Sequence, residues 1–573
     1  MKIKGLTTAL LGLAVAVASC DGNSSLNKSV SNREPDAKYV GQAIGNFSAS
    51  EWYPGGLLGT TLNVTAGCYE DETPAVSEQG LTAAFNLGEA AFERKYTTAT
   101  APFKGLGPAY LRSSCLDCHP GYGHGKRQSE YKSEFGNGYL LVIYHPVDGQ
   151  NSDDGPYVAE VTGMPQTRAT YPFLPPVDES KINIMWKNVT AMESGLPMTF
   201  PDGEEYNLIY PEVTIPEEAF NTSPTPYQTG AVAIRLESTI GIIGSGLLDA
   251  IPQDSIRDQY RKEAAHATLN PAFWDKDAND FAAGAWYGYD RLGPGRFADG
   301  TPAEAGTKLL KRFTYAMTRA SLQDGAGANA IWNITNVSRS DRPYLYTTKA
   351  WAKAMSQNPD VIAAIKQDPS SPYYADGTDQ GIQEAVLNLL DPSTNQFDNQ
   401  WHNFQPEMSD NQYYNFMVWH RGLSIPRSRN LNREEVQKGK EVFNRIGCAS
   451  CHRASWTTTD DNYWKPEVYA DKELPQYKEQ TIWPYTDMIQ HRLYMINGIH
   501  GSWCRTTPLW GRGLSRSNTG AEDRLHDNRA RNVIEAIMWH GYSRESDAYW
   551  CTEKFYNLSK EERDAVVEFI NSI

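Results

Sequence analysis

The chain carries the pattern Cys-x-x-Cys-His twice, at residues 115–119 and 448–452, and no other feature limits the chain as strongly. Two thiols at this spacing can add to the two vinyl groups on one edge of a porphyrin. The histidine that follows can then reach the iron. The pattern therefore predicts two covalently bound c-type haems. The predicted attachment residues are Cys115, Cys118, Cys448 and Cys451, and the predicted iron ligands are His119 and His452.

Two other kinds of site use paired cysteines, and neither accounts for the pattern as well. A thioredoxin-like redox pair does not need the histidine behind the second cysteine. A zinc site needs a second compact pair of ligands nearby, but the two copies lie far apart in the chain.

The other cysteines leave the disulfide pattern open. The chain has 8 cysteines, and those outside the two haem patterns are Cys20, Cys68, Cys504 and Cys551. Export would permit disulfides. Because Cys504 and Cys551 flank one segment of the C-terminal region, we expect a disulfide between them. Cys68 would then be free or half of another pair.

The first residues have the character of a targeting segment. "MKIK" supplies positive charge, and a short apolar run ends in Val-Ala-Ser before Cys20. Small residues before a single cysteine are typical of a bacterial lipobox, in which Cys20 is lipidated. The alternative is a plain secretory peptide that is cut nearby. We therefore predict a lipoprotein signal peptide at 1–19 and a flexible tether at 20–45. The protein would be exported to the periplasmic or cell-surface face of a membrane and held there only by lipid.

Composition excludes one large class of partners. The chain has 573 residues and a net charge of -16. A protein that binds nucleic acid needs a basic surface to displace counterions, so we expect no nucleic-acid partner. The length allows two or more domains.

Each haem pattern follows a similar helical segment. Gly88 and Phe92 precede the first copy, and Gly439 and Phe443 precede the second with the same spacing. Asn432 is the expected cap of the second helix, and a capped terminal helix over 559–573 would close that module. Between residues 139 and 215, alternating apolar residues predict an antiparallel β insert. The expected fold is mainly α, with two cytochrome c-like haem modules and with this insert and long loops in the larger N-terminal domain. The expected domains are 46–430 and 431–573.

Several phrases give the chain a family resemblance. They are "GLGPAYLRSSCLDCHPGYGHG", "DGEEYNLIYPEVTI", "IRLESTIGIIGSGLLDAIP", "GLSIPRSRN", "RTTPLWGRGL" and "RLHDNRARNVIEAIMWHG", of which the last two are the most specific. Together they resemble the di-haem oxidoreductase (putative peroxidase) family. This family is related to bacterial di-haem cytochrome c peroxidases and to the di-haem enzyme that matures methylamine dehydrogenase. The resemblance covers most of the chain after the targeting segment.

The resemblance implies different roles for the two haems. In such peroxidases the C-terminal haem relays electrons, and the N-terminal haem binds and reduces hydrogen peroxide. In the relatives, a Met or Tyr that ligates the C-terminal iron ends the stretch that resembles residues 524–540. That position here is His540, which would give bis-histidine ligation with His452 and a lower potential than Met would give. The rival ligands are Met488, Met495, Met538 and His491, and His526 is expected to bind a haem propionate or a loop.

The catalytic residues of the N-terminal haem are less clear from the sequence. Its chemistry needs a group that accepts and returns a peroxide proton. The candidates are Glu237, Asp249 and Gln323, while His124 or His145 could instead cap the iron. The relatives carry an acid or glutamine in the region that reads "RASLQDGAGANAIWNITNV" here. This chain has Ile331, Trp332 and Asn333 where the acid is expected, which puts peroxidase chemistry in doubt.

Three functions remain open on these grounds. The leading one is a di-haem c-type peroxidase that takes electrons from a small redox protein and passes them to hydrogen peroxide or a similar oxidant. The second is a lipid-tethered electron-transfer cytochrome without substrate chemistry. The third is a di-haem oxidase that modifies a partner protein. The relatives often hold calcium between domains, and the matching stretch "NTGAEDRLHD" departs from their form, so calcium remains an open expectation.

Overall fold

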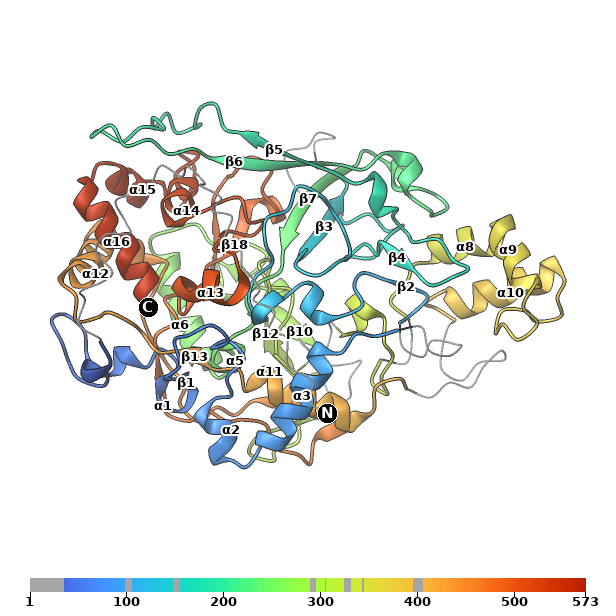
Figure 1. Cartoon of the computed structure of the whole chain (residues 1–573), viewed down its shortest axis with the longest axis horizontal. Coiled ribbons are helices and arrows are strands. Elements are labelled where there is room, and N and C mark those ends of the chain that lie inside the picture. The colour runs from blue at the N-terminus through green and yellow to red at the C-terminus, as the bar shows by residue number, and fades with distance from the viewer. Residues whose placement is uncertain are drawn as a thin grey trace, which may run out of the picture.

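The computed structural model describes residues 36–97, 106–147, 155–288, 295–304, 306–323, 331–342, 345–394 and 406–573. Helices of all types make up 34% of the structure and strands 15%, so the class is mixed α and β with long loops. The expectation of a mainly α fold is wrong. That expectation applied the helical pattern of the segments before the two haem patterns to the whole chain. Between these segments, loops and two-stranded sheets fill most of the space (Figure 1).

The helices are short, and all but one of those with eight residues or more fall into three groups. Around the first haem pattern lie α3 (Thr82–Glu93) and α11 (Asp410–Arg421). Around the second lie α12 (Glu434–Ile446), α14 (Val533–His540), α15 (Tyr549–Tyr556) and α16 (Lys560–Ser572). A lobe at one end of the molecule holds α8 (Lys349–Gln357), α9 (Pro359–Lys366) and α10 (Asp379–Leu390) (Figure 1). The remaining one is α6 (Gln253–Ala264), and the shortest are α1 (Gly56–Gly59), α2 (Pro74–Glu78), α4 (Pro226–Thr229), α5 (Ser245–Asp249) and α13 (Ser515–Thr519).

Every described sheet has two strands. The longest pairs are antiparallel: β3 (Tyr139–Tyr144) with β7 (Ala233–Ser238), and β5 (Asn183–Asn188) with β6 (Ile209–Thr214). A parallel pair joins β1 (Thr60–Thr61) to β13 (Ile425–Pro426). The short antiparallel pairs are β2 (Ala109–Tyr110) with β4 (Arg168–Ala169), β8 (Trp274–Asp275) with β9 (Asp280–Phe281), β10 (Trp286–Gly288) with β12 (Lys308–Leu310), β11 (Arg296–Phe297) with β15 (Trp464–Lys465), β14 (Trp456–Thr457) with β16 (Thr481–Ile482), and β17 (Gln490–Arg492) with β18 (Trp503–Arg505).

The two haem patterns are each framed by a pair of crossed helices. Helix α3 packs on α11, and α12 packs on α16. Each crossing has a glycine at its centre. A Cβ atom on Gly88 would collide with the carbonyl oxygen of Asn415, and one on Gly439 would collide with that of Ala565. The repeated Gly-x-x-x-Phe spacing therefore marks close helix packing in both modules. The sequence did not reveal that α11 closes the first module from far along the chain.

Two helix ends differ in detail from the expectation. Helix α12 begins after Arg433 and has no side-chain cap, so Asn432 is not the cap. At α16, the Ser559 hydroxyl accepts a hydrogen bond from the Glu562 backbone as expected. The Glu562 carboxylate turns away to pair with Arg445 on α12. A charge pair between the two crossed helices thus replaces the second half of the capping box.

The β insert reaches across to the C-terminal helices. Figure 1 shows β5 and β6 running from the central β3–β7 pair over α14 and α15. The loop between β5 and β6 packs Phe200 against Phe555 and Tyr556. Its carboxylates Asp202 and Glu204 pair with the buried Arg563 of α16. The insert is therefore part of the wall around the C-terminal module.

The segment before β1 also belongs to that wall. Phe47 and Trp52 are buried in the same core as α12 and α16. Lys440 of α12 forms a 2.6 Å ion pair with Glu51, and Arg427 pairs with Asp36. The expected signal peptide at 1–19 and most of the expected tether lie outside the described residues. The last part of the tether, 36–45, is ordered and packs against the C-terminal module.

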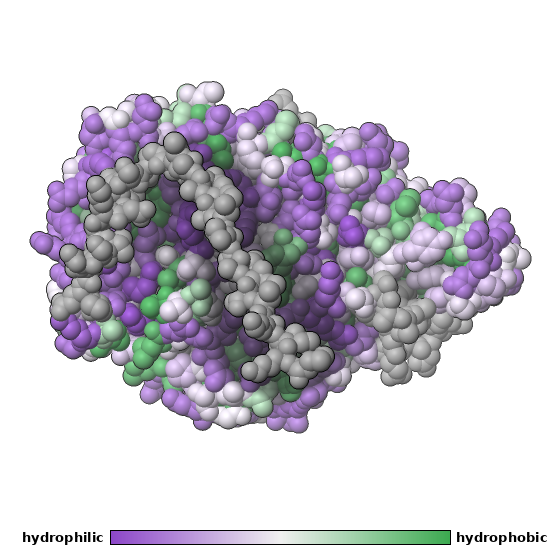
Figure 2. Space-filling model, in the orientation of Figure 1, coloured by the Kyte–Doolittle hydropathy of each residue, from purple (hydrophilic) through white to green (hydrophobic). Residues whose placement is uncertain are grey.

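The helices of the described residues were compared with the length and hydropathy that a membrane span requires. Among the described residues, none of the helices combines the length and the apolar character needed to cross a bilayer. The face shown in Figure 2 is largely hydrophilic, with hydrophobic residues in small separate groups.

Candidate haem sites

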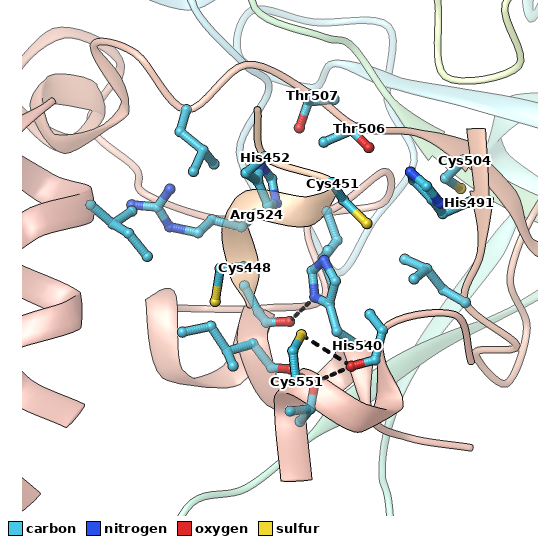
Figure 3. A pocket seen from close by; sticks show the side chains of 18 of the residues that line it. Cys448, Cys451, His452, His491, Cys504, Thr506, Thr507, Arg524, His540 and Cys551 are labelled. Atoms are coloured by element: carbon cyan, nitrogen blue, oxygen red, sulfur yellow. Dashed lines mark hydrogen bonds between the residues drawn. The ribbon is translucent and has the colours of Figure 1, made fainter. Parts of the chain in front are cut away.

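The second Cys-x-x-Cys-His pattern lies at the mouth of a cavity in the C-terminal module. Helix α12 ends at Gly447, whose φ of 103° is a conformation that favours glycine. The chain then makes a single 3-10 turn over Cys448–Ser450. The side chains of Cys448, Cys451 and His452 all line the cavity (Figure 3). The turn therefore presents both thiols and the imidazole to one space.

Both haem-pattern histidines are oriented in the same way. Nδ1 of His452 donates to the carbonyl oxygen of Tyr485 at 3.0 Å, and Nδ1 of His119 donates to that of Gly123 at 3.1 Å. Such a bond fixes the tautomer and leaves Nε2 free to bind a metal. Burial lowers the pKa of each imidazole to about 4. Both rings are therefore neutral near pH 7, as an iron ligand must be.

His540 lies on the opposite side of the C-terminal cavity. It is the last residue of α14, and its Nδ1 donates to the carbonyl oxygen of Ala536 at 2.6 Å. Its ring centre is 6.5 Å from that of His452. Because a metal–imidazole bond is about 2 Å long, two imidazoles on opposite sides of one ion have ring centres roughly 6 to 6.5 Å apart. The separation thus matches an iron held between His452 and His540.

The rival ligands are less well placed. Met488 and Met538 are buried in hydrophobic clusters and do not line the cavity. Met495 lines it. His491 also lines it, but its Nε2 lies 2.6 Å from the Asp487 carboxylate. Although burial alone would lower it, that carboxylate holds the pKa of His491 well above its usual range. A histidine in such an ion pair is a poor iron ligand.

Three arginines, of which Arg505 and Arg524 are buried and Arg512 is half-buried, make this cavity suited to the propionates of a haem. Arg505, Arg512 and Arg524 line it, and none of the ion pairs among the described residues involves them. Burial lowers the pKa of Arg505 to about 10 and that of Arg524 to about 9. The Nε atoms of both are buried without a partner. A buried cation without an anion is costly, and two haem carboxylates would supply the missing charge.

His124 and His526 stand at the arginine side of the cavity. His124 contacts Arg512 through Nδ1, and its Nε2 accepts from the Gly241 backbone at 3.2 Å. His526 lines the same cavity, and its Nε2 is buried without a hydrogen bond. Its backbone oxygen accepts from Ser238 of β7. His526 therefore has a free nitrogen for a propionate and a backbone bond to the N-terminal region.

The first Cys-x-x-Cys-His pattern opens on a separate and roomier cavity. Its volume is about 320 Å³, against about 170 Å³ for the C-terminal one. Cys115, Cys118 and His119 line it. Among the described residues, no ring pair joins His119 to a second imidazole as His452 is joined to His540. The polar side chains that line this cavity together with His119 include Glu237, Asn333 and His500.

The structure separates the candidate acids and caps of the N-terminal haem. Glu237 lines the cavity. Asp249 does not, because its carboxylate pairs with Arg421 at 2.7 Å. Gln323 is buried elsewhere and donates to the carbonyl oxygen of Trp464. Nδ1 of His145 donates to the carbonyl oxygen of Ala231 near the surface, and His145 is not among the residues that line this cavity. His124 lies in the wall of the C-terminal cavity instead.

His420 is a cavity residue that the sequence reading missed. It lies on α11 and is 3% exposed, and both ring nitrogens lack a hydrogen bond. It lines the N-terminal haem cavity. Burial lowers its pKa to about 3. The signal in the sequence was its place one residue after Trp419, which matches the place of Ile570 after Phe569 on α16.

The other residues considered in the sequence, two cysteines and the carboxylates of the calcium stretch, contact different partners in the structure. No disulfide links Cys504 to Cys551 in the described structure. Cys551 lies against Cys448, whereas Cys504 pairs with His491 on the β17–β18 ladder. In the stretch considered for calcium, Glu522, Asp523 and Asp527 each pair with an arginine. The described cluster with metal-binding spacing is Cys451, Asp487 and His491, and its thiol is one that haem attachment would consume.

Comparison with known proteins agrees with the resemblance seen in the sequence. No curated protein matches the chain. Residues 397–573, which hold α11 and most of the residues that line the C-terminal cavity, His452 and His540 included, match the model of the family described as "Di-haem oxidoreductase, putative peroxidase".

Proposed function

We propose that the chain is a di-haem c-type peroxidase in which the C-terminal haem relays electrons and the N-terminal haem is the place of peroxide reduction. The observation that carries this proposal is the asymmetry between the two cavities. His540 stands across from His452 at the spacing of two axial ligands. The N-terminal cavity is larger, and the side chain of Glu237 is among the residues that line it together with His119.

The residues around each cavity divide the work. Haem, when bound, would relay electrons from the donor at one site and offer an open coordination position at the other. His452 and His540 would hold the C-terminal iron from both sides, which favours electron transfer with little rearrangement. Arg505, Arg512 and Arg524 would hold the propionates. At the N-terminal cavity His119 would hold the iron from one side, and Glu237 would take a proton from peroxide and return it to the leaving oxygen.

The location and partners follow as parts of the same proposal. The lipobox at Cys20 would tether the protein to a membrane after export. There it would receive electrons from a small redox protein and use hydrogen peroxide or a similar oxidant. The net charge of -16 suits a partner with a basic docking face.

A spectroscopic titration tests this function. In the oxidised haem-loaded protein we expect one low-spin haem with two histidine ligands. After one-electron reduction, the second haem should react with hydrogen peroxide, and an added reductant should supply the second of the two electrons that each peroxide consumes. Two low-spin haems and no reaction with peroxide in either state would contradict the peroxidase function.

A second function, electron transfer without substrate chemistry, has one observation in its favour. His420 lies in the N-terminal cavity with both nitrogens unpartnered. If it moved to bind the iron, that site would close. The same titration separates the two functions, because a closed site gives a second low-spin haem.

A further inference from the structure

Three residues from distant parts of the chain meet at one wall of the N-terminal haem cavity. Glu237 lies on β7, and His500 lies in the turn between β17 and β18 of the C-terminal module. Tyr157 follows β3. The Glu237 carboxylate is 3.5 Å from Nε2 of His500. Nδ1 of His500 is 3.4 Å from the Tyr157 hydroxyl. All three line the cavity that contains His119.

We propose that Tyr157, His500 and Glu237 form a path that carries protons from solvent to the N-terminal haem cavity. The inference rests on the proposed function for its role in turnover, since peroxide reduction consumes protons. His500, a residue of the C-terminal module, would then transfer protons at the N-terminal haem.

The exposure of the three residues places Tyr157 at the surface and the other two in the interior. Tyr157 is 50% exposed, whereas the side chains of His500 and Glu237 are 11% and 17% exposed. The Tyr157 hydroxyl can donate to Nδ1 of His500, which places the ring proton on Nε2, facing Glu237. A proton can then pass from Nε2 to the carboxylate while the tyrosine hydroxyl supplies the next one. Distances of this length shorten or take a bridging water in a working complex.

The backbone fixes the middle residue of the path. His500 has φ of 55°, a left-handed conformation that residues other than glycine seldom adopt. The turn that holds it sits on the β17–β18 pair, which also carries His491 beside Cys451 of the C-terminal haem. The position of the His500 ring is thus set by the C-terminal module.

The other titratable groups near the path are poor proton carriers. His526 and Tyr315 both face Glu237 from neighbouring segments. Burial lowers the pKa of His526 to about 4 and raises that of Tyr315 above its usual range. Beyond them, Asp527 is committed to Arg529. Both neighbours therefore stay neutral near pH 7.

The stoichiometry shows what the path must deliver. Reduction of one hydrogen peroxide takes two electrons and two protons, breaks the O–O bond and yields two waters. The electrons arrive from the donor through the C-terminal haem. The protons enter through Tyr157 and His500, and Glu237 passes them to the oxygen atoms.

Variants of His500 in the haem-loaded full-length protein test the path. His500→Gly suits the left-handed backbone and leaves room for an added imidazole. We expect the turnover rate with peroxide to fall about 100-fold, in the range of lost acid–base catalysis, with little change in KM. Added imidazole should restore most of it. His145→Gln, which alters a histidine outside the cavity, should match the unaltered protein. A His500→Gly protein with unchanged turnover, or one that imidazole does not rescue, would overturn the path.

A measurement without peroxide separates this inference from the proposed function. The reduction potential of the N-terminal haem should depend on pH in the unaltered protein, because reduction draws a proton into the cavity. Glu237→Gln keeps the shape of the side chain but cannot exchange a proton, so this dependence should flatten. If peroxide does not react but the pH dependence of the potential flattens in Glu237→Gln, the peroxidase function is contradicted and the proton path is supported. An equal pH dependence in both proteins would contradict the path.

Discussion

The two haem modules share a frame and differ in what faces the haem. In both, a glycine lets two helices cross closely, and a phenylalanine four residues on packs near the haem-pattern histidine. The ring centres of Phe92 and His119 are 6.3 Å apart, as are those of Phe443 and His452. Both histidines donate Nδ1–H to a backbone carbonyl. The frame therefore serves attachment and orientation, which the two haems have in common.

The opposite wall of each cavity comes from unrelated segments. In the C-terminal module it is α14, which ends at His540. In the N-terminal module the residues proposed to act on the substrate come from β7, which pairs with β3 of the β insert and brings Glu237, and from the β17–β18 turn, which brings His500. Under the proposed function, the wall with an imidazole at ligand distance would close one iron, and the wall with an acid would leave the other open to a substrate. The two modules thus differ in residues that lie outside the repeated motif.

Removal of His540 should have the largest effect on the difference between the two haem sites. In His540→Ala the C-terminal haem loses its second ligand, so its low-spin signal should vanish and a high-spin signal should replace it. Electron paramagnetic resonance of the oxidised protein measures this. His266→Ala, at an exposed histidine, should leave the spectrum unchanged. A low-spin haem that survives in His540→Ala would give the sixth position to another residue, with Met495 the nearest candidate in the cavity lining.

Loss of Arg421 should have the next largest effect, because it anchors α11 to the N-terminal module. Its guanidinium pairs with Asp249 and Asp461, and all three are buried. Arg421→Ala leaves two buried carboxylates together, so the free energy of unfolding should fall by about 3–5 kcal/mol at pH 7. Urea unfolding measures it.

The pH dependence of that loss gives a further check. Burial raises the pKa of Asp461 to about 6 even beside Arg421. The folded state thus binds more protons than the unfolded chain between about pH 4 and 6, and acid favours the fold there. Part of the stability of Arg421→Ala should return as the pH falls through that range. Arg168→Ala, which breaks an exposed pair with Glu179, should cost less than about 1 kcal/mol.

Alanine at the two crossing glycines should have smaller and similar effects. A Cβ at Gly88 or Gly439 meets a backbone carbonyl that cannot turn away. Each variant should lose about 1–3 kcal/mol of stability in thermal unfolding, although alanine is the better helix former. Because the two crossings are far apart, the double variant should show the sum. Gly163→Ala, where a Cβ has room, is the control. A loss at only one glycine would mean that the frames are not equivalent.

Replacement of His420 should have the smallest effect and sharpen the comparison. His420→Leu removes a buried imidazole without partners, so stability should rise by about 1 kcal/mol. If the N-terminal iron is open, its spin state should not change. A low-spin N-terminal haem that becomes high-spin in His420→Leu would instead identify His420 as a ligand and favour the electron-transfer function.

Local pattern carried some predictions well. The glycine and phenylalanine spacing before each haem motif marked α3 and α12, because helix packing repeats every three to four residues. Alternation marked β3, β5 and β6, because strand side chains alternate between faces. The segment over 157–163 also alternates but forms only a single bridge, Tyr144 with Tyr157. The true partner of β3 is β7, which is distant in the chain.

Predictions that depended on distant contacts succeeded less often. Asp249 and Glu237 looked equivalent as candidate acids, and only packing sent one to Arg421 and the other to the haem cavity. Cys551 was expected beside Cys504, but α15 places it beside Cys448. His420 was not recognised, because its place after Trp419 becomes a signal only when α11 is compared with the distant helix α16.

The sequence by itself predicted the two haem attachment points, because covalent attachment needs only a short pattern on one turn of chain. It also pointed to His540, through a resemblance that residues 397–573 bear out at the family level. Only the tertiary structure decided what lies across from each histidine. Those walls are made by α11, α14, the β insert and the β17–β18 turn, and contacts between segments so far apart depend on the packing of the whole chain.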